Sequence, residues 1–363
     1  MAKDLVGVSA DYIFFCAYLA DLDDGKAVEI NGGMLQNFLD ALSHTGAIKQ
    51  LKRILLVNGL KQYGAHLGVP KQPMHETDPW LEGPGWPPNF YYTQQHILID
   101  AAAKANGAWT WVVTYPQDVI GVAKANFMNL ATALGLYCAV SKQLSGELPF
   151  PGSKASYLAF NCWTSANLHA KFCLWAVTAP NTGNQAFNVI NGDTESWQNL
   201  WPRLAARFGC KIPRVMFPGG ERGKYNGFEP LTIPLREEPP AAAFQDSMGL
   251  AGEFKQSFVH QQIDTTKWAQ RPEVVQAWEQ LRDKYKLDQQ AWEKATWLFM
   301  TYLLGRDFSC VVSMSKARKF GWTGYQDTWD AFEETFKELE ENDILPPAAE
   351  LKNSGADVTA ESK

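Results

Sequence analysis

The sequence lacks the clustered cysteines and histidines of a metal or redox centre. Its six cysteines stand far apart without a C-x-x-C pair, and its six histidines never show H-E-x-x-H or similar spacing. Scattered cysteines without a secretion signal are typical of reduced thiols in a cytoplasmic protein. We therefore predict a cytoplasmic protein without a metal site.

The sequence also lacks an excess of basic charge and a run long enough to cross a membrane. Lys and Arg number 33 against 39 Asp and Glu, which gives a net charge of −6, and no basic cluster resembles a phosphate-binding footprint. The apolar run YIFFCAYLA at 12–20 is too short for a bilayer and lies between Asp11 and Asp21. We expect no nucleic acid and no membrane as partners, and a small molecule as the ligand.

Aromatic side chains, by contrast, are abundant. They make up 13% of the chain and include 14 tryptophans. Large flat side chains suit a pocket for an apolar ligand, but they suit cores and interfaces equally well.

Strand-like and helix-like segments alternate over roughly the first 215 residues. Short apolar runs typical of buried parallel strands lie at 12–18, 53–59, 109–115 and 186–190. Apolar residues at steps of three and four predict helices at 27–45, 92–106, 126–144, 164–178 and 196–208. This alternation predicts right-handed crossovers and an α/β fold with an open, doubly wound parallel sheet.

A smaller, mainly helical lobe is predicted after residue 215. The loop-like stretches FPGGERGKYNGF and IPLREEPPAAA are followed by helical patterns at about 273–284, 288–303 and 325–340. From residue 347 the sequence has no apolar periodicity and is predicted to be disordered. The expected organisation is a sheet core at 1–215, a substrate-binding lobe at 216–346 and a disordered tail at 347–363.

Lys61 and two tyrosines stand where such a sheet places its chemistry. Ligands bind beyond the carboxyl ends of the strands, and Lys61 and Pro116 follow two of the predicted strands. A nearby lysine ammonium lowers the pKa of a tyrosine, whose hydroxyl can stabilise an oxygen that gains negative charge. Tyr91 or Tyr92, at the start of a predicted helix, could lie beside Lys61. Spacing alone favours a structural explanation, with a solvated lysine and tyrosines packed under the helix.

Six motifs run along the chain in a fixed order. Three are NGLKQY, NFYYTQQH and WTWVVTYPQDVIG; the others are FMNLATALGLY, AFNVINGDTESWQNLWPRLAARFG and SMSKARKFGWTGYQDTWDAF. The first three resemble TG-x-K-H-Y, NFYY-x-x-ED and TWSVHRP-x-x-IFG of the progesterone 5β-reductase/iridoid synthase-like (PRISE) family. These are atypical extended short-chain dehydrogenases/reductases. The resemblance extends from residue 11 to about 346, and six collinear matches are far more specific than any one of them.

The resemblance implies a Rossmann-like reductase that uses NADPH to reduce the C=C bond of an apolar enone, in specialised metabolism. The catalytic pair of the family carries over to Lys61 and Tyr91, with the tyrosine holding the enone oxygen while hydride reaches the β-carbon. The residues implied to contact the cofactor are Cys16, Ala17, Tyr18, Asn58, Gly59, Pro116 and Val119. Those implied to contact the substrate are Tyr92, Asp118, Met128 and Leu67.

Several positions depart from the family's motifs. The His-Arg pair before the proline is Thr114–Tyr115 here, and the Glu-Asp pair after NFYY is Gln95–His96. Asp118 replaces an asparagine near the substrate carbonyl, where a carboxylate would oppose a developing enolate unless it is protonated or solvated. The segment GAHLG at 64–68 replaces Met-Gly-Pro-Phe of the plant members. The wall of the substrate pocket has therefore changed.

The Gly-rich phosphate turn at the start of family members has no counterpart in this sequence. Such a G-x-x-G-x-x-G turn lets the backbone approach the pyrophosphate at a helix N-terminus. The strand at 12–18 resembles the family's fourth strand, so we expect an incomplete sheet that lacks the first three βα units. NADPH binding is in doubt for that reason, and the exposed strand edge invites pairing with another chain, such as in a homodimer.

Two alternative functions stay open at this point. A carbonyl reductase or epimerase of the same fold would use the same Tyr and Lys but transfer hydride at a carbon that bears oxygen. A non-catalytic pseudoenzyme would bind ligand without cofactor, and its function would be insensitive to changes at Lys61 and Tyr91.

Overall fold

The computed structural model describes residues 2–123 and 128–353, and within these ranges four parallel strands form the central sheet. The strands are β1 (Tyr12–Phe15), β2 (Arg53–Val57), β3 (Thr110–Pro116) and β7 (Gln185–Val189), in the order β1-β2-β3-β7. The first four residues of β2 are buried, as expected for a parallel strand covered on both faces. All four strands lie where the sequence predicted them.

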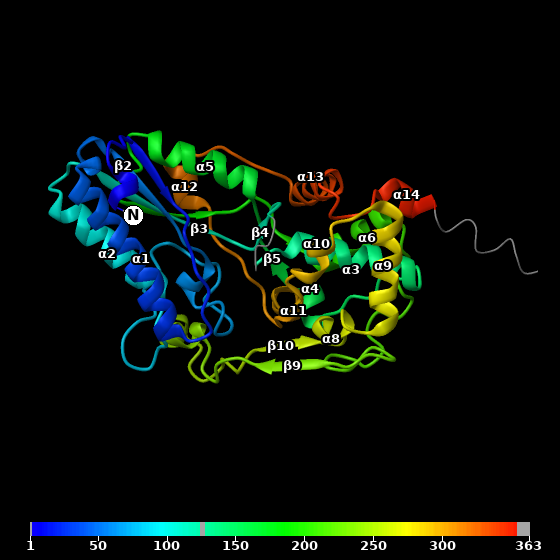
Figure 1. Ribbon diagram of the computed structural model, residues 1–363. Helices are drawn as coiled ribbons and strands as arrows, with labels where there is room; N and C mark the ends of the chain where they lie inside the picture. The colour runs from blue at the N-terminus through cyan, green and yellow to red at the C-terminus, as the bar shows by residue number, and fades with distance from the viewer. Residues whose placement is uncertain (1, 124–127, 354–363) are drawn as a thin grey trace, which may run out of the picture.

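Helices cover both faces of this sheet (Figure 1). On one face Phe15 contacts Phe38 with 5.7 Å between the ring centroids. Val113 lies in the same cross-strand row as Phe15, so the next residue, Thr114, points to the opposite face. There its hydroxyl lies 3.0 Å from a ring nitrogen of His169. Helices α1 (Asp24–Thr45) and α2 (Phe90–Lys104) cover the face to which Phe15 points, and helix α5 (Ala166–Thr178) covers the face to which Thr114 points. The predicted doubly wound, Rossmann-like architecture is confirmed.

A helical lobe with its own core adjoins the carboxyl ends of the strands (Figure 1). Its centre is α3 (Leu130–Leu144), in which every residue from Leu130 to Ser141 is buried. A helix that is apolar all round must be enclosed by other elements. The enclosing helices are α6 (Trp197–Phe208), α9 (Pro272–Tyr285), α10 (Gln289–Glu293), α11 (Trp297–Gly305) and α13 (Thr328–Glu341).

The two cores do not divide the chain at residue 215 as predicted. Helices α3 and α6 come from the first segment but pack into the helical lobe, whereas α12 (Ser315–Lys319) returns to pack against β7. The lobe also contains an antiparallel pair, β9 (Leu231–Pro234) with β10 (Phe258–Gln261). The sequence pattern predicted α3 and α6 but not α12, and it could not show which apolar faces meet.

The prediction of a disordered tail from residue 347 is wrong for its first part. Ala348–Asn353 form helix α14, which packs against α6. Leu351 is buried, and the main chain at Lys352 lies against Gly209. Residues 354–363 of the predicted tail lie outside the described residues. One buried leucine in a short helix is too weak a pattern to be seen in the sequence.

Shorter elements connect the main ones. The single-turn helices are η1 (Ala2–Leu5), η2 (Ala47–Gln50), η3 (Leu60–Tyr63), η4 (Pro240–Phe244), α4 (Lys154–Leu158), α7 (Gln245–Met248) and α8 (Thr265–Trp268). The two-residue strands are β4 (Val119–Ile120), β5 (Phe160–Asn161), β6 (Thr164–Ser165) and β8 (Glu195–Ser196).

Replacing Leu351 by Ala should lower the free energy of unfolding by about 2 to 3 kcal/mol, because the change leaves a cavity between α14 and α6. Urea denaturation measures this difference. Glu350→Ala, an exposed change one residue earlier, should shift the free energy by less than about 0.5 kcal/mol. Equal effects of the two variants would mean that α14 does not contribute its buried face to the fold.

Candidate active site

Three segments meet beyond the carboxyl ends of β2 and β3. At Gly59 an added Cβ atom would lie 3.2 Å from the hydroxyl oxygen of Tyr91 and 3.3 Å from the carbonyl oxygen of Pro116. The end of β2, the first turn of α2 and the end of β3 are therefore in direct contact. Lys61 lies on η3, two residues after this close approach.

The side chain of Asn89 connects the segments that carry Lys61 and Tyr91. Its Oδ1 accepts a hydrogen bond from the backbone N–H of Tyr91 at 3.1 Å, which caps the N-terminus of α2. Its Nδ2 donates to the carbonyl oxygen of Lys61 at 2.8 Å. One asparagine thus fixes the start of the helix and the lysine turn relative to each other, and the structure brings the predicted catalytic pair to one site.

Burial controls the ionisation of this pair. Burial lowers the pKa of Lys61, while the Asp24 carboxylate partly opposes that shift; the ammonium lies 5.5 Å from the ring centroid of Phe90. Burial raises the pKa of Tyr91 well above its usual value, and Tyr18 adds to this shift. The expectation that Lys61 lowers the pKa of Tyr91 is therefore wrong, because desolvation of the phenolate dominates. Burial therefore keeps the Tyr91 hydroxyl protonated at neutral pH.

The segment after β1 lies next to the same site. Cys16, Ala17 and Tyr18 follow the strand directly, and the ring of Tyr18 stacks on Phe90 with 5.1 Å between centroids. Buried Asn31 anchors the segment: its Oδ1 accepts from Leu19 N and its Nδ2 donates to Leu19 O, both at 2.9 Å.

The other predicted cofactor residues occupy the strand ends. Asn58 is 6% exposed, and neither polar atom of its side chain has a hydrogen-bond partner. Pro116 is buried at the end of β3, whereas Val119 is exposed in β4. The strand ends therefore offer an unpaired amide and an apolar surface next to Gly59.

Tyr92, one of the predicted substrate residues, has its hydroxyl bound to the main chain. The hydroxyl donates to Gln62 O at 2.7 Å and accepts from Leu81 N at 3.1 Å, and the ring stacks on Trp80. Leu67 is half-buried, and Met128 is 41% exposed just before α3. Any contact of Tyr92 with substrate would therefore be through its ring and not through its hydroxyl.

Asp118, the fourth predicted substrate residue, forms a buried ion pair with Arg306. The Arg306 Nη2 also donates to Asn161 Oδ1 at 2.7 Å. Burial lowers the pKa of Arg306, but the Asp118 carboxylate outweighs this effect and the net shift is upward. The carboxylate near the site is thus compensated by a fixed cation, which removes much of the expected conflict with a developing enolate.

Tyr115 and Gln95, two residues that differ from the family's motifs, contact each other. Tyr115 donates to Gln95 Oε1 at 2.5 Å, and Gln95 Nε2 donates to Gln62 Oε1 at 2.8 Å. His96, in contrast, is exposed and lies 3.2 Å from Glu82. The replacements at 95 and 115 therefore form one buried network and act as a unit.

Sequence reasoning missed three residues around the site. Arg306 was not identified because a lone arginine after an apolar helix carries no motif. Tyr302 donates to the carbonyl oxygen of Ala65 at 2.5 Å, which joins α11 to the segment after Lys61. Next to it, His66 has a buried Nδ1 without a partner, and burial together with Lys61 lowers its pKa to about 3. Only the tertiary structure brings these groups to the lysine.

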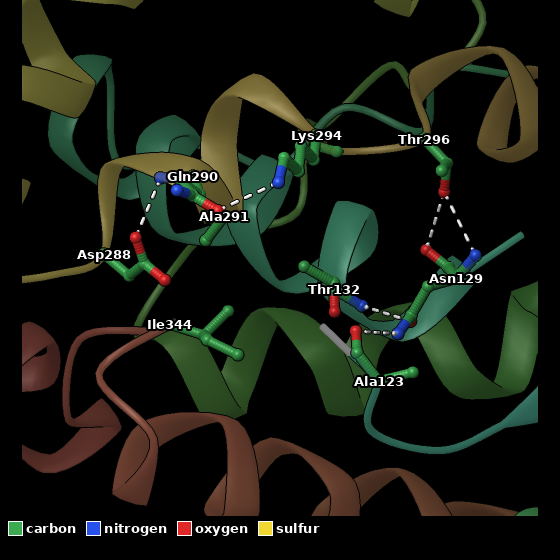
Figure 2. Close-up of a pocket in the computed structure, with 10 residues that line it drawn as sticks. Ala123, Asn129, Thr132, Asp288, Gln290, Ala291, Lys294, Thr296 and Ile344 are labelled. Atoms are coloured by element: carbon green, nitrogen blue, oxygen red, sulfur yellow. Dashed lines mark hydrogen bonds between the residues drawn. The ribbon is translucent and has the colours of Figure 1, made fainter. Parts of the chain in front are cut away.

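A separate cavity of about 60 Å³ lies at the N-terminus of α3, between α3 and α10 (Figure 2). The hydroxyl of Thr296 donates to the carbonyl oxygen of Asn129 at 3.0 Å, and Lys294 Nζ donates to Gln290 Oε1 at 2.9 Å. None of its lining residues belongs to the Lys61–Tyr91 site.

Other kinds of site find no support in the described part of the chain. No group of three or more His, Cys, Asp or Glu side chains there is placed to hold a metal ion. No helix among these residues combines the length and the apolar character that a bilayer crossing needs. The six cysteines are free thiols, of which Cys16 is exposed.

The parallel sheet and the Lys and Tyr at its strand ends define a Rossmann-type protein of the short-chain dehydrogenase/reductase class. Residues 3–226 match the sequence model described as the PRISE-like Rossmann-fold domain. The chain belongs to this family, and it is an oxidoreductase of the short-chain dehydrogenase/reductase type. The predicted family membership is confirmed.

Individual relatives agree with this assignment. An uncharacterised protein of Schizosaccharomyces pombe is 36% identical over 339 residues, which cover 93% of this chain and 81% of that protein. The 3-oxo-Δ(4,5)-steroid 5β-reductase of Arabidopsis thaliana is 26% identical, covering 88% and 71%. The terminal R domain of the myxalamid PKS-NRPS pathway has the same fold, with a TM-score of 0.53, 14% identity and coverage of 93% and 70%.

Arg306→Met should lower the free energy of unfolding by about 3 to 5 kcal/mol, because the Asp118 carboxylate stays buried without its cation. Urea denaturation of the single variants and of Asp118→Asn combined with Arg306→Met measures the coupling. The double variant should recover most of the loss, since it removes both charges. A double variant as unstable as Arg306→Met would contradict the assigned pairing.

His66 should make the protein less stable as the pH falls below neutrality. Its folded pKa of about 3 is below the ordinary value of 6.5. The stability that neutral His66 contributes to the folded state is therefore complete above pH 6.5 and is lost as the pH falls towards 3. Unfolding measured between pH 7 and 4 should show a smaller loss of stability for His66→Gln than for the unmodified protein. His44→Gln, on an exposed position of α1, should leave the slope unchanged; equal slopes for all three proteins would refute the assignment.

Proposed function

We propose that this protein reduces the activated C=C bond of an apolar enone with NADPH as the hydride donor. The observation that carries the proposal is the close approach of Gly59 to the Tyr91 hydroxyl and the Pro116 carbonyl oxygen at the strand ends, two residues before Lys61. The named activity of the Arabidopsis relative, reduction of a 3-oxo-Δ(4,5)-steroid, supports the same class of substrate. The carbonyl reductase and epimerase alternative has no specific observation in its favour.

The residues present fit a nicotinamide ring at this position. Gly59 lets the end of β2 approach Tyr91 and Pro116 closely, so that these residues and the unpaired amide of Asn58 stand together where such a ring would lie. NADPH, when bound, supplies a hydride. Tyr18 and Cys16 would border the ring from the side of β1, and Pro116 and Val119 from the side of β3.

Tyr91 would bind the enone oxygen through its hydroxyl. Hydride addition at the β-carbon moves the C=C electron pair into the carbon-oxygen system, so negative charge develops on that oxygen. A neutral phenol can donate a hydrogen bond to this charge, and a buried donor is worth more than one in water. Lys61 adds positive charge nearby. Protonation of the α-carbon by solvent or a side chain completes the reduction.

Lys61→Ala and Tyr91→Phe should each lower kcat/KM for enone reduction by about 100-fold or more, because each removes stabilisation of the enolate oxygen. NADPH consumption with a series of cyclic and acyclic enones measures the rate. Lys104→Ala and Tyr325→Phe, both at exposed positions, are the matched controls and should retain full rates.

Product analysis separates the alternatives. With a substrate that holds both an enone and an isolated ketone, loss of the C=C bond supports the proposal, whereas loss of the ketone shows a carbonyl reductase. Full function of both Lys61→Ala and Tyr91→Phe, or a folded chain that shows no NADPH binding by fluorescence, would refute an active reductase. An intact relative run alongside validates the assay.

A further inference from the structure

The cavity between α3 and α10 has an unpaired hydroxyl in its wall. Thr132 lines this cavity and is only 8% exposed, and its Oγ1 forms no hydrogen bond with the part of the chain that the structure describes. Figure 2 shows Thr132 between Asn129 and Ile344, which line the same cavity. A buried hydroxyl without a partner is destabilising. A ligand that fills the cavity and binds this hydroxyl would therefore stabilise the folded protein.

The N-termini of two helices meet in the wall of this cavity. Asn129 is the N-cap residue of α3, and Thr296 is the N-cap residue of α11. The N–H of Asn129 donates to Thr296 Oγ1 at 3.2 Å, and that hydroxyl donates to Asn129 O at 3.0 Å. The Thr296 hydroxyl therefore does not cap its own helix. Each helix N-terminus carries about half a positive elementary charge, so two of them side by side favour an anion.

The two charged side chains in the described lining have opposite signs. Lys294 adds a cation with three N–H donors, of which Gln290 Oε1 accepts one at 2.9 Å. The Asp288 carboxylate caps α10 through the N–H of Gln290 at 2.9 Å. Figure 2 shows Asp288 on the far side of the cavity from Asn129 and Thr296. Because this carboxylate repels further negative charge, the lining favours a ligand with a single negative charge near the two helix N-termini.

The size of the cavity and its apolar wall limit the rest of the ligand. Ala291, Ala295 and Ile344 contribute apolar surface, and the volume is about 60 Å³. A water molecule takes up about 30 Å³ in the liquid, so only a ligand of a few non-hydrogen atoms fits. A carboxylate on a short alkyl chain meets both demands. Inorganic phosphate, which has more charge and no apolar group, suits this wall less well.

We propose that the cavity binds a short-chain aliphatic monocarboxylate. The Thr132 hydroxyl donates a hydrogen bond to the carboxylate, which lies in the positive field of Lys294 and the N-termini of α3 and α11. The alkyl group packs on the apolar wall that includes Ile344. This inference does not rest on the proposed reduction, because no lining residue belongs to the Lys61–Tyr91 site.

The test is calorimetric titration with sodium propionate at constant ionic strength. Thr132→Val should weaken binding about tenfold, because it keeps the shape of the side chain but removes a hydrogen bond to an ionised group. Lys294→Met should also weaken binding, whereas Asp288→Asn should strengthen it, since these changes remove charges of opposite sign and asparagine still caps α10. Thr178→Val and Lys337→Met, both at exposed positions, should bind propionate as the unmodified protein does.

Two further probes test the chemical class of the ligand. Propionamide has nearly the same size as propionate but no charge, and it should bind more weakly. Inorganic phosphate should bind more weakly as well. Tighter binding of either probe than of propionate would overturn the assignment of a monocarboxylate.

The outcomes are independent of the reductase proposal. No saturable binding of propionate by the unmodified protein, or equal binding by folded Thr132→Val and Lys294→Met variants, overturns the site and leaves the enone reductase proposal intact. Thermal unfolding of each variant verifies that it is folded before the titration.

Discussion

The geometry of the active site depends on the side chain of Asn89. It caps α2 through the N–H of Tyr91 and holds the carbonyl oxygen of Lys61, so the predicted catalytic pair is positioned by a polar contact between η3 and the start of α2, both of which follow β2. The cap satisfies an N–H that would otherwise be unpaired at the helix start. The same side chain that caps the helix therefore also holds the turn that carries Lys61. Gly59 completes the arrangement because it alone allows the end of β2 to approach the tyrosine hydroxyl.

Burial, more than the pairing of charges, sets the chemistry of the site. Desolvation keeps Tyr91 neutral and lowers the pKa of Lys61, which suits a tyrosine that donates a hydrogen bond to an oxygen on the way to an enolate. Arg306 compensates Asp118 at the edge of the same region. The helical lobe supplies this cation, and Tyr302 binds the segment after Lys61. The helical lobe therefore contributes a charged group near the site and a hydrogen bond that holds the segment after Lys61.

Departures from the family's motifs become intelligible once their contacts are known. Gln95 and Tyr115 replace charged residues of the motifs and bind each other inside the protein, so the two replacements share one buried contact. Asp118 replaces an asparagine, and its carboxylate pairs with Arg306. Such compensation is expected because an unpaired buried polar or charged group is strongly destabilising. The motifs show where the chain differs, whereas only the contacts show which partners the differing residues have.

The sequence by itself determined the strands, the main helices, the doubly wound sheet and the segments that carry Lys61 and Tyr91, because apolar periodicity and strand-end position are local properties. The tertiary structure decided which helices share a core: α3 and α6 join the lobe, and α12 returns to the sheet. The tertiary structure also decided the ionisation of Tyr91, the pairing of Asp118 with Arg306 and the folding of residues 348–353 into helix α14. These properties depend on burial and on contacts between residues far apart in the chain, which no local pattern contains.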